Sequence, residues 1–231
     1  MITNYNDFVT ELLAAGFSVS TGGNDEGIFG LIKYGWNEEV PDNPVRWHTG
    51  DPETDPWEWR MRVLDERDDI AYAKIFFRKG GFITKEWYPY FLAARRGRMT
   101  FEDEYNEGKI SHFAKRIYET VAEQDCLALH DIKQLAGFKR EDKAKFDNAV
   151  TELQMRMHLT ICGRKQKTSH KGEGYGWHST VLCTTEKFWV AEIFDEASQI
   201  SAAQAHEMIS EQVYKLNPNA IGKKIAKFIY G

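Results

Sequence analysis

The sequence predicts a helix-rich fold of the α+β class. Apolar residues recur at the three- and four-residue spacing of amphipathic helices along much of the chain. A few runs rich in Thr, Val, Ile and Leu indicate strands. The 231 residues, 42% hydrophobic and 28% charged, can bury one large core or two small ones. We expect an N-terminal α+β region over residues 1–108, a central domain over 109–192, and C-terminal helices over 193–231 that pack on the rest.

The N-terminal region contains a loop rich in tryptophan, proline and acidic residues, "VRWHTGDPETDPWEWRMRVLDE" at 45–66, which leads into a helix. Asp55 is suited to the N-cap of that helix, because its side chain can accept a hydrogen bond from an unpaired backbone amide. Pro56 then stands at the first helical position, where proline is favoured, and Glu58 stands at the third.

A β-hairpin and another helix are expected over residues 70–96. The Gly80-Gly81 pair can adopt the positive φ angles of a two-residue turn, so we place the turn there. Thr84 is the expected cap of the following helix.

The middle of the chain has the element order of a winged helix. Residues 110–124, 130–138 and 143–157 show helical spacing of apolar side chains. Two short runs typical of strands follow, at 158–162 and 179–183. We therefore expect three helices and a two-stranded wing.

The segment between those strands, "GRKQKTSHKGEGYGWH" at 163–178, is basic in a chain with a formal net charge of −5. Residues 1–125 carry 15 Lys and Arg against 23 Asp and Glu, whereas residues 126–192 carry 11 against 8. Attraction to a polyanion should therefore concentrate in residues 126–192. Lys and Arg neutralise phosphates, and aromatic rings stack on sugars or bases. A solvated hairpin tip is the alternative. The residues predicted to contact duplex DNA are Lys143, Lys145, Arg156, Arg164, Lys165, Lys167, His170, Lys171, Tyr175 and Trp177.

Apolar residues also have helical spacing in the C-terminal segment. We expect one face to be buried against the rest of the chain and its lysines to stay in solvent. The residues predicted for the buried face are Ile209, Val213, Leu216, Ile221, Ile225 and Phe228.

Three phrases of the sequence resemble the AlkZ-related proteins, bacterial relatives of the AlkZ/YcaQ winged-helix DNA glycosylases. They are "HTGDPETDPWEWR" at 48–60, "AYAKIFFRKGGFITKEWYPYFLAARRG" at 71–97, and the ending "LNPNAIGKKIAKFIYG". The resemblance implies a role in DNA repair. Full-length members hydrolyse the N-glycosidic bond of alkylated or crosslinked bases, and a Gln-apolar-Gln motif in an N-terminal winged helix positions the water.

This sequence departs from that pattern, because no two of its glutamines are separated by a single residue and all of them follow residue 120. No catalytic residue of the family can be carried over. A carboxylate could activate the water instead, and aromatic walls suit an extruded base. The alternative is that the acids cap the helix and the rings anchor the loop. The candidate catalytic residues are Asp51, Glu53, Asp55 and Glu58, set among Trp47, Trp57 and Trp59.

We expect no cofactor and no metal. A metal site at His48 with Asp51 and Asp55 lacks a second histidine at ligand spacing. The three cysteines include no C-x-x-C pair, so we expect reduced thiols, with Cys126 buried in its apolar run "CLAL".

The sequence has neither a signal-peptide pattern nor an apolar run long enough for a bilayer, so we expect a cytoplasmic protein without a membrane partner. Two classes of function stay open. One is a DNA-binding protein of glycosylase kinship, active or catalytically degenerate. The other is a non-enzymatic winged-helix module that binds a protein partner or regulates one.

Overall fold

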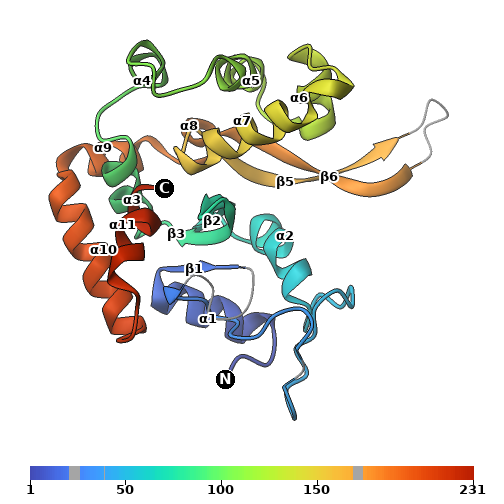
Figure 1. The fold of residues 1–231 in the computed structure, drawn as a ribbon. Helices are drawn as coiled ribbons and strands as arrows, with labels where there is room; N and C mark the ends of the chain where they lie inside the picture. The colour runs from blue at the N-terminus through green and yellow to red at the C-terminus, as the bar shows by residue number, and fades with distance from the viewer. Residues whose placement is uncertain (21–26, 39, 169–173) are drawn as a thin grey trace. The chain divides into compact units, whose positions relative to one another are not determined.

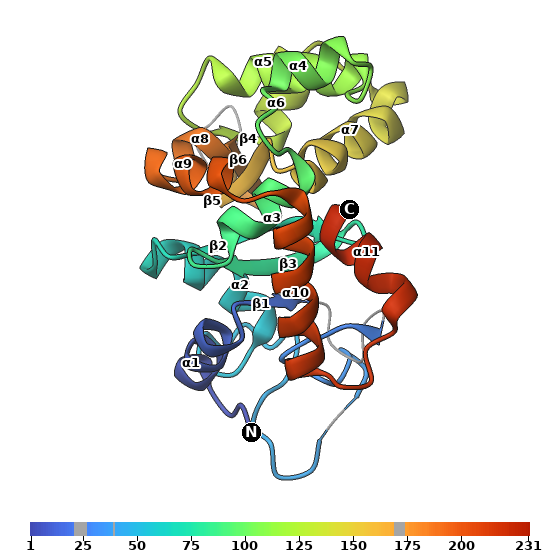
Figure 2. The same cartoon turned by 90° about the vertical axis from the view of Figure 1, so that its left-hand side faces the viewer.

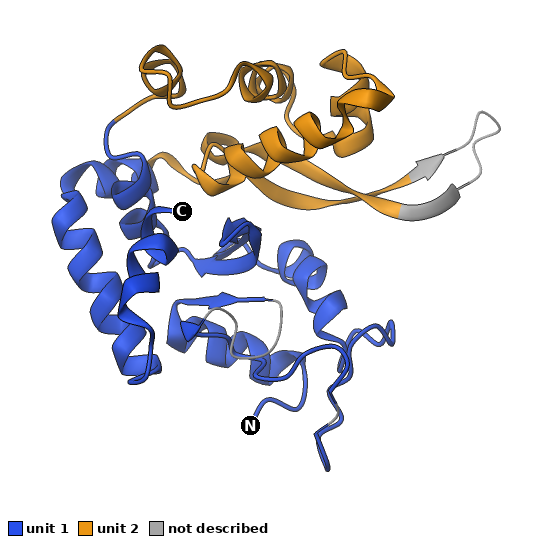
Figure 3. Cartoon of the chain, viewed as in Figure 1, with its two compact units in different colours: residues 1–98, 192–231 blue, residues 99–191 orange. Residues whose placement is uncertain are grey.

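The computed structural model describes residues 1–20, 27–38, 40–168 and 174–231. Its helices and antiparallel strands confirm the predicted α+β class (Figure 1). The chain divides into two compact units (Figure 3). Unit 1 comprises Met1–Arg98 and Glu192–Gly231, and unit 2 comprises Met99–Ala191.

Three strands of unit 1 pair in the order β1, β3, β2, and each pair is antiparallel. Phe17 lies opposite Ile83, and Tyr72 lies opposite Phe82. These strands are almost wholly buried, in keeping with their continuous apolar sequence. Their bounds are β1 (Phe17–Val19), β2 (Ile70–Phe76) and β3 (Lys79–Thr84).

The turn between β2 and β3 does not lie at Gly80-Gly81 as predicted. Phe77 and Arg78 form it, with positive φ angles of 51° and 63°. The two glycines belong to β3, where a β-carbon on Gly80 would come within 2.4 Å of the Tyr72 hydroxyl. Glycine is therefore needed here for close packing within the hairpin and not for its turn.

The predicted cap of the next helix is also wrong. Thr84 ends β3, and α3 (Tyr88–Arg95) begins later, with Trp87 at the N-cap and no side-chain hydrogen bond there. By contrast, Asp55 caps α2 (Pro56–Glu66) as predicted and accepts a hydrogen bond from the amide of Trp57.

Aromatic rings fill the core of unit 1. Phe228 stacks on Phe76 with ring centroids 4.1 Å apart, and it also contacts Phe17 and Phe91. All four side chains are fully buried. Burial of this cluster brings the end of the chain against strands formed near its start.

The C-terminal helices pack against α3 (Figure 2). Four of the six residues predicted for their buried face are buried: Ile209, Val213, Ile225 and Phe228. Ile221 is 39% exposed, because it precedes the last helix and lies at its N-cap. Apart from α2 and α3, the helices within residues 1–98 and 191–231 are α1 (Tyr5–Ala15), α9 (Ala191–Gln199), α10 (Ala202–Leu216) and α11 (Gly222–Tyr230).

Arg95, at the end of α3, holds the last turn of α11 in place. Its guanidinium donates to the backbone oxygens of Phe228, at 2.9 Å, and Ile229, at 2.7 Å. It also donates to the oxygen of Ile75 in β2, at 2.9 Å. A cation is favoured at the C-terminal end of a helix, where backbone carbonyls lack partners. Burial lowers the pKa of Arg95 to about 9, which leaves it charged at neutral pH.

Unit 2 has a helical layer built around three phenylalanines. Phe138 packs edge-on against Phe146 at 5.2 Å and lies 5.9 Å from Phe113. The guanidinium of Arg116 lies 4.6 Å from the centre of the Phe138 ring. The helices are α4 (Phe101–Asn106), α5 (His112–Ala122), α6 (Leu129–Leu135), the 3₁₀ turn η2 (Arg140–Asp142), α7 (Lys143–Met155) and α8 (Thr185–Phe188).

A long antiparallel hairpin of β5 (Leu159–Thr168) and β6 (Gly174–Thr184) follows α7. The two-residue strand β4 (Leu127–Ala128) pairs with the other edge of β6. The helix predicted over 143–157 forms over Lys143–Met155. The strands predicted at 158–162 and 179–183 pair as expected and extend further than predicted.

Cys126 is exposed, so the prediction of its burial is wrong. It precedes β4, at the border of the strands, where few side chains cover it. In the described ranges of the chain, no helix combines the length and the apolar character that a membrane crossing requires.

Replacement of Phe228 tests the aromatic core. Phe228→Ala should lower the free energy of unfolding by about 3–5 kcal/mol, because it leaves a cavity among buried rings. Tyr230→Ala on the same helix is the control, since that ring is 45% exposed, and it should cost less than about 1 kcal/mol. Urea denaturation measures both, and equal losses would contradict this description of the core.

Candidate nucleic-acid interface

The β5–β6 hairpin carries two of the predicted DNA-binding cations. Arg164 and Lys165 are exposed and lie opposite Thr180 and Ser179. The Lys165 ammonium lies 3.3 Å from a carboxylate oxygen of Asp131 in α6. Because surface ion pairs contribute little free energy, this pair can exchange for a phosphate at small cost.

A second group of cations lies at the turn between α6 and α7. Lys139, Arg140 and Lys143 are all exposed, and Lys143 is the first residue of α7. The N-terminal end of a helix has a positive partial charge, which adds to the attraction for an anion. Lys145 is exposed as well and pairs with Asp142 at 3.1 Å.

These two groups lie at one end of unit 2. In Figure 1, α6 and the start of α7 lie at the end from which the hairpin projects. The Lys165–Asp131 pair joins the hairpin to α6 at this end. The five cations Lys139, Arg140, Lys143, Arg164 and Lys165 are called the basic surface below.

Arg156 is directed elsewhere. It follows the end of α7 and donates to Glu104 at 2.9 Å. The same carboxylate lies 2.6 Å from His158, and both Glu104 and His158 are almost completely buried. Losing one partner of such a buried ionic group is costly, so Arg156 contributes to the stability of unit 2. Its side chain is 31% exposed, and its role in DNA binding stays a prediction.

The other predicted contacts lie between residues 167 and 177 of the sequence. Lys167 and Tyr175 lie opposite each other in β5 and β6, and Trp177 also lies in β6. His170 and Lys171 lie outside the described residues. A role of these five residues in DNA binding stays a prediction.

The four candidate catalytic carboxylates lie in or next to the loop before α2, and Asp55 organises that loop. Its side chain is fully buried and accepts three backbone hydrogen bonds, from His48 at 3.0 Å, Gly50 at 2.9 Å and Trp57 at 2.8 Å. A carboxylate occupied in this way holds the loop together.

Asp51 and Glu53 also have local partners. Asp51 accepts from the amide of Glu53 and from the hydroxyl of Thr54, and these bonds lower its pKa. A lowered pKa makes a carboxylate a weaker base at neutral pH. Glu53 pairs with Arg62 at 2.7 Å, and Glu58, in the first turn of α2, is half-buried. These contacts give Asp51 and Glu53 a structural role in the loop.

An aromatic cluster next to this loop was only partly anticipated. His48 lies 4.7 Å from Trp57 and 5.7 Å from Trp36, measured between ring centroids. Trp36 is 68% exposed, and the Arg60 guanidinium lies 3.4 Å above the Trp57 ring. Exposed rings beside a cation can stack on a base or a sugar. The sequence signal was the density of tryptophan at 47–59, but nothing in it linked Trp36 to the loop.

Of the side chains considered for a metal at His48, Asp55 already accepts backbone hydrogen bonds through both of its oxygens. Within the described parts of the chain, no three His, Cys, Asp or Glu side chains are grouped so as to hold a metal ion.

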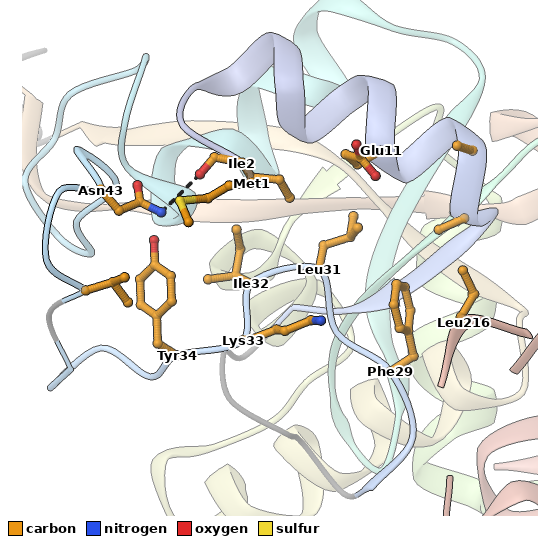
Figure 4. A pocket seen from close by; sticks show the side chains of 13 residues that line it. Met1, Ile2, Glu11, Phe29, Leu31, Ile32, Lys33, Tyr34, Asn43 and Leu216 are labelled. Atoms are coloured by element: carbon orange, nitrogen blue, oxygen red, sulfur yellow. Dashed lines mark hydrogen bonds between the residues drawn. The ribbon is translucent and has the colours of Figure 1, made fainter. Parts of the chain in front are cut away.

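Unit 1 also has an open, mainly apolar pocket of about 590 Å³ (Figure 4). Asn43, on its wall, donates to the backbone oxygen of Ile2 at 3.1 Å. Burial raises the pKa of Tyr34, so its hydroxyl stays protonated. None of the residues predicted from the sequence to bind or react lines this pocket. The lining residues are Met1, Ile2, Glu11, Ala14, Ala15, Phe29, Leu31, Ile32, Lys33, Tyr34, Val40, Asn43 and Leu216.

Comparison with protein families gives a match to the family described as "AlkZ related", over residues 2–230. The chain belongs to the AlkZ-related family. Comparisons with curated proteins and with solved structures give no match. The family match covers almost the whole AlkZ-related chain, both units included, and relates it to DNA glycosylase-like proteins.

The role of Asp55 as an organiser of the loop can be measured. Asp55→Ala should lower the free energy of unfolding by about 2 kcal/mol or more, because it removes an N-cap and leaves two further amides without their acceptor. Asp51→Ala, at an exposed position of the same loop, should cost about 1 kcal/mol or less. Urea denaturation followed by tryptophan fluorescence compares the two. A smaller loss for Asp55→Ala than for Asp51→Ala would contradict the assignment.

Proposed function

We propose that unit 2 of this AlkZ-related protein is a winged-helix domain that binds duplex DNA. The order α5, α6, α7 and then a β5–β6 hairpin supports this proposal, as does the pairing of the short strand β4 with β6. In such a domain, α7 is the helix that enters a groove and the hairpin is the wing that lies along the backbone.

The observation that carries the proposal is the basic surface. Exposed cations from the start of α7 and from the hairpin lie at one end of unit 2, although the whole chain has a formal net charge of −5. Phosphate contacts of Lys and Arg release condensed counterions, which supplies sequence-independent affinity. Family membership adds that related proteins are DNA glycosylase-like.

We also propose that the loop carboxylates do not hydrolyse a glycosidic bond. Asp55 is committed to three backbone amides, Asp51 to two local donors, and Glu53 to Arg62. A general base must be able to reach its water, and a hydrogen-bonded carboxylate of lowered pKa is poorly suited to that role. The sequence also lacks a Gln-x-Gln motif. The protein is then a DNA-binding relative of the glycosylases.

A winged helix that docks on a protein remains the second candidate, because the same fold serves both purposes. The salt dependence of binding distinguishes the two. Phosphate contacts give a steep decrease in affinity as salt rises, whereas docking on a protein need not.

Removal of hairpin cations tests the DNA-binding proposal. Arg164→Ala/Lys165→Ala should reduce the slope of log affinity against log salt by about 0.9 for each phosphate that is no longer neutralised, so by about 1.8 if both residues bind phosphate. The decrease in affinity should be similar on unrelated sequences, because phosphate contacts carry no sequence information. Fluorescence anisotropy with labelled duplexes over a salt series measures the slope.

The matched control is Lys85→Ala/Lys215→Ala, which removes two exposed cations from unit 1. It should leave the slope unchanged. A wild-type protein that fails to bind duplex DNA at low salt would refute the proposal. Equal effects of the two double variants would show that the DNA does not bind through the basic surface.

A base-release assay tests the proposal on catalysis. On alkylated and on crosslinked duplexes, the wild-type protein should release no more base than buffer does. Asp51→Asn and Glu53→Gln serve as matched variants, since each removes a charge and keeps the shape of the side chain. Release by the wild type that either variant abolishes would show that a loop carboxylate is catalytic.

A further inference from the structure

Unit 1 exposes two tryptophan rings beside one histidine. Trp36 is 68% exposed, Trp57 is 40% exposed, and His48 is exposed as well. The His48 ring centroid lies 5.7 Å from that of Trp36 and 4.7 Å from that of Trp57, so the three rings adjoin. We call these three residues the aromatic surface. Large rings gathered in solvent mark interaction sites, and tryptophan is enriched among the residues that contribute most to protein binding.

Asp55 fixes the backbone that carries two of these rings. Its side chain accepts a hydrogen bond from the amide of His48, at 3.0 Å, and another from the amide of Trp57, at 2.8 Å. The positions of His48 and Trp57 relative to each other are therefore set before any partner binds. A surface that is already ordered loses less conformational entropy on binding, which favours affinity.

The part of the chain that carries the aromatic surface is acidic. Residues 34–60 contain seven Asp and Glu against two Arg and no Lys. Glu38 and Asp51 are exposed, and the Glu38 carboxylate accepts a hydrogen bond from the amide of Gly35, the residue before Trp36. Negative charge attracts cations and repels phosphates. A stacked nucleotide would bring its phosphate into this acidic region, so the charge favours a cationic ligand.

An arginine of the chain itself shows how a cation fits these rings. The Arg60 guanidinium lies 3.4 Å from the centre of the Trp57 ring and donates to the backbone oxygen of Trp57 at 2.8 Å. A planar guanidinium can stack on an aromatic ring and still use its N–H groups for hydrogen bonds. Trp36 has the more exposed ring of the two, so it is open to a cation from another molecule.

We propose that the aromatic surface binds an arginine-rich segment of another protein. One arginine of that segment stacks on Trp36, and its other cations are attracted by the acidic side chains of residues 34–60. Lysine at the stacked position keeps the charge but lacks the flat guanidinium, so it binds less tightly. All of these residues belong to unit 1, so the proposal does not depend on DNA binding by unit 2.

Binding of short peptides to the full-length protein tests this proposal. The probe is a labelled peptide of alternating Arg and Gly, and two further peptides have Lys or Glu in place of Arg. Fluorescence anisotropy at low salt measures the affinities. The arginine peptide should bind several-fold more tightly than the lysine peptide of equal charge, because a guanidinium stacks flat on the ring. The glutamate peptide should not bind.

Variants then assign the contact to the aromatic surface. Trp36→Ala should weaken binding of the arginine peptide by about three- to tenfold, as expected for the loss of one stacked cation. Glu38→Gln should reduce the salt dependence of binding, because it removes a charge and keeps an acceptor for the Gly35 amide. Both positions are exposed, so the fold should be unaffected. Tyr214→Ala is the matched control, since it removes a 45% exposed ring elsewhere in unit 1 and should not change binding.

Three results with the peptides would overturn the proposal: no binding of the arginine peptide, equal affinity for the arginine and lysine peptides, or equal affinity of Trp36→Ala and the wild type. Single-stranded DNA is the competing probe. DNA binding that Trp36→Ala abolishes and Tyr214→Ala preserves would identify a base-stacking site instead. Self-association of the wild type that Trp36→Ala abolishes would show that the surface binds a second copy of the chain and not another protein.

Discussion

The antiparallel ladder between β5 and β6 is the interaction on which the basic surface depends. Its register places Arg164 and Lys165 opposite small polar residues of β6, so their long side chains reach solvent. The same ladder accommodates an irregularity in register between Ile161 and Gly163. A hairpin can hold cations away from a core because its backbone bonds are satisfied within the ladder itself.

In unit 1, the charged side chains described above bind partners within the fold. Most of its acidic loop residues bind backbone amides or a neighbouring arginine, and Arg95 binds the carbonyls at the end of the last helix. These groups stabilise a fold that joins the two ends of the chain. Kinship to glycosylases therefore need not bring their chemistry, since an acid in a loop beside tryptophans can serve structure alone.

The sequence predicted the features that depend on local pattern. The amphipathic helix over 143–157, the Asp55 cap and most of the buried C-terminal face follow from spacing and cap chemistry, which neighbouring residues decide. Features set by distant partners were missed. The turn lies at Phe77-Arg78, and Gly80 instead allows close packing against Tyr72. The ion pair of Arg156 with Glu104, 52 residues before it, was not anticipated either.

Lysine acetylation followed by mass spectrometry, with and without a saturating duplex, tests the central claim most directly. We expect DNA to protect Lys139, Lys143 and Lys165, because their ammonium groups would contact phosphates. Lys85 and Lys215, which are exposed in unit 1, should be acetylated equally in both samples. Unchanged labelling of the basic surface, or protection confined to unit 1, would contradict the claim that unit 2 binds DNA through its basic surface.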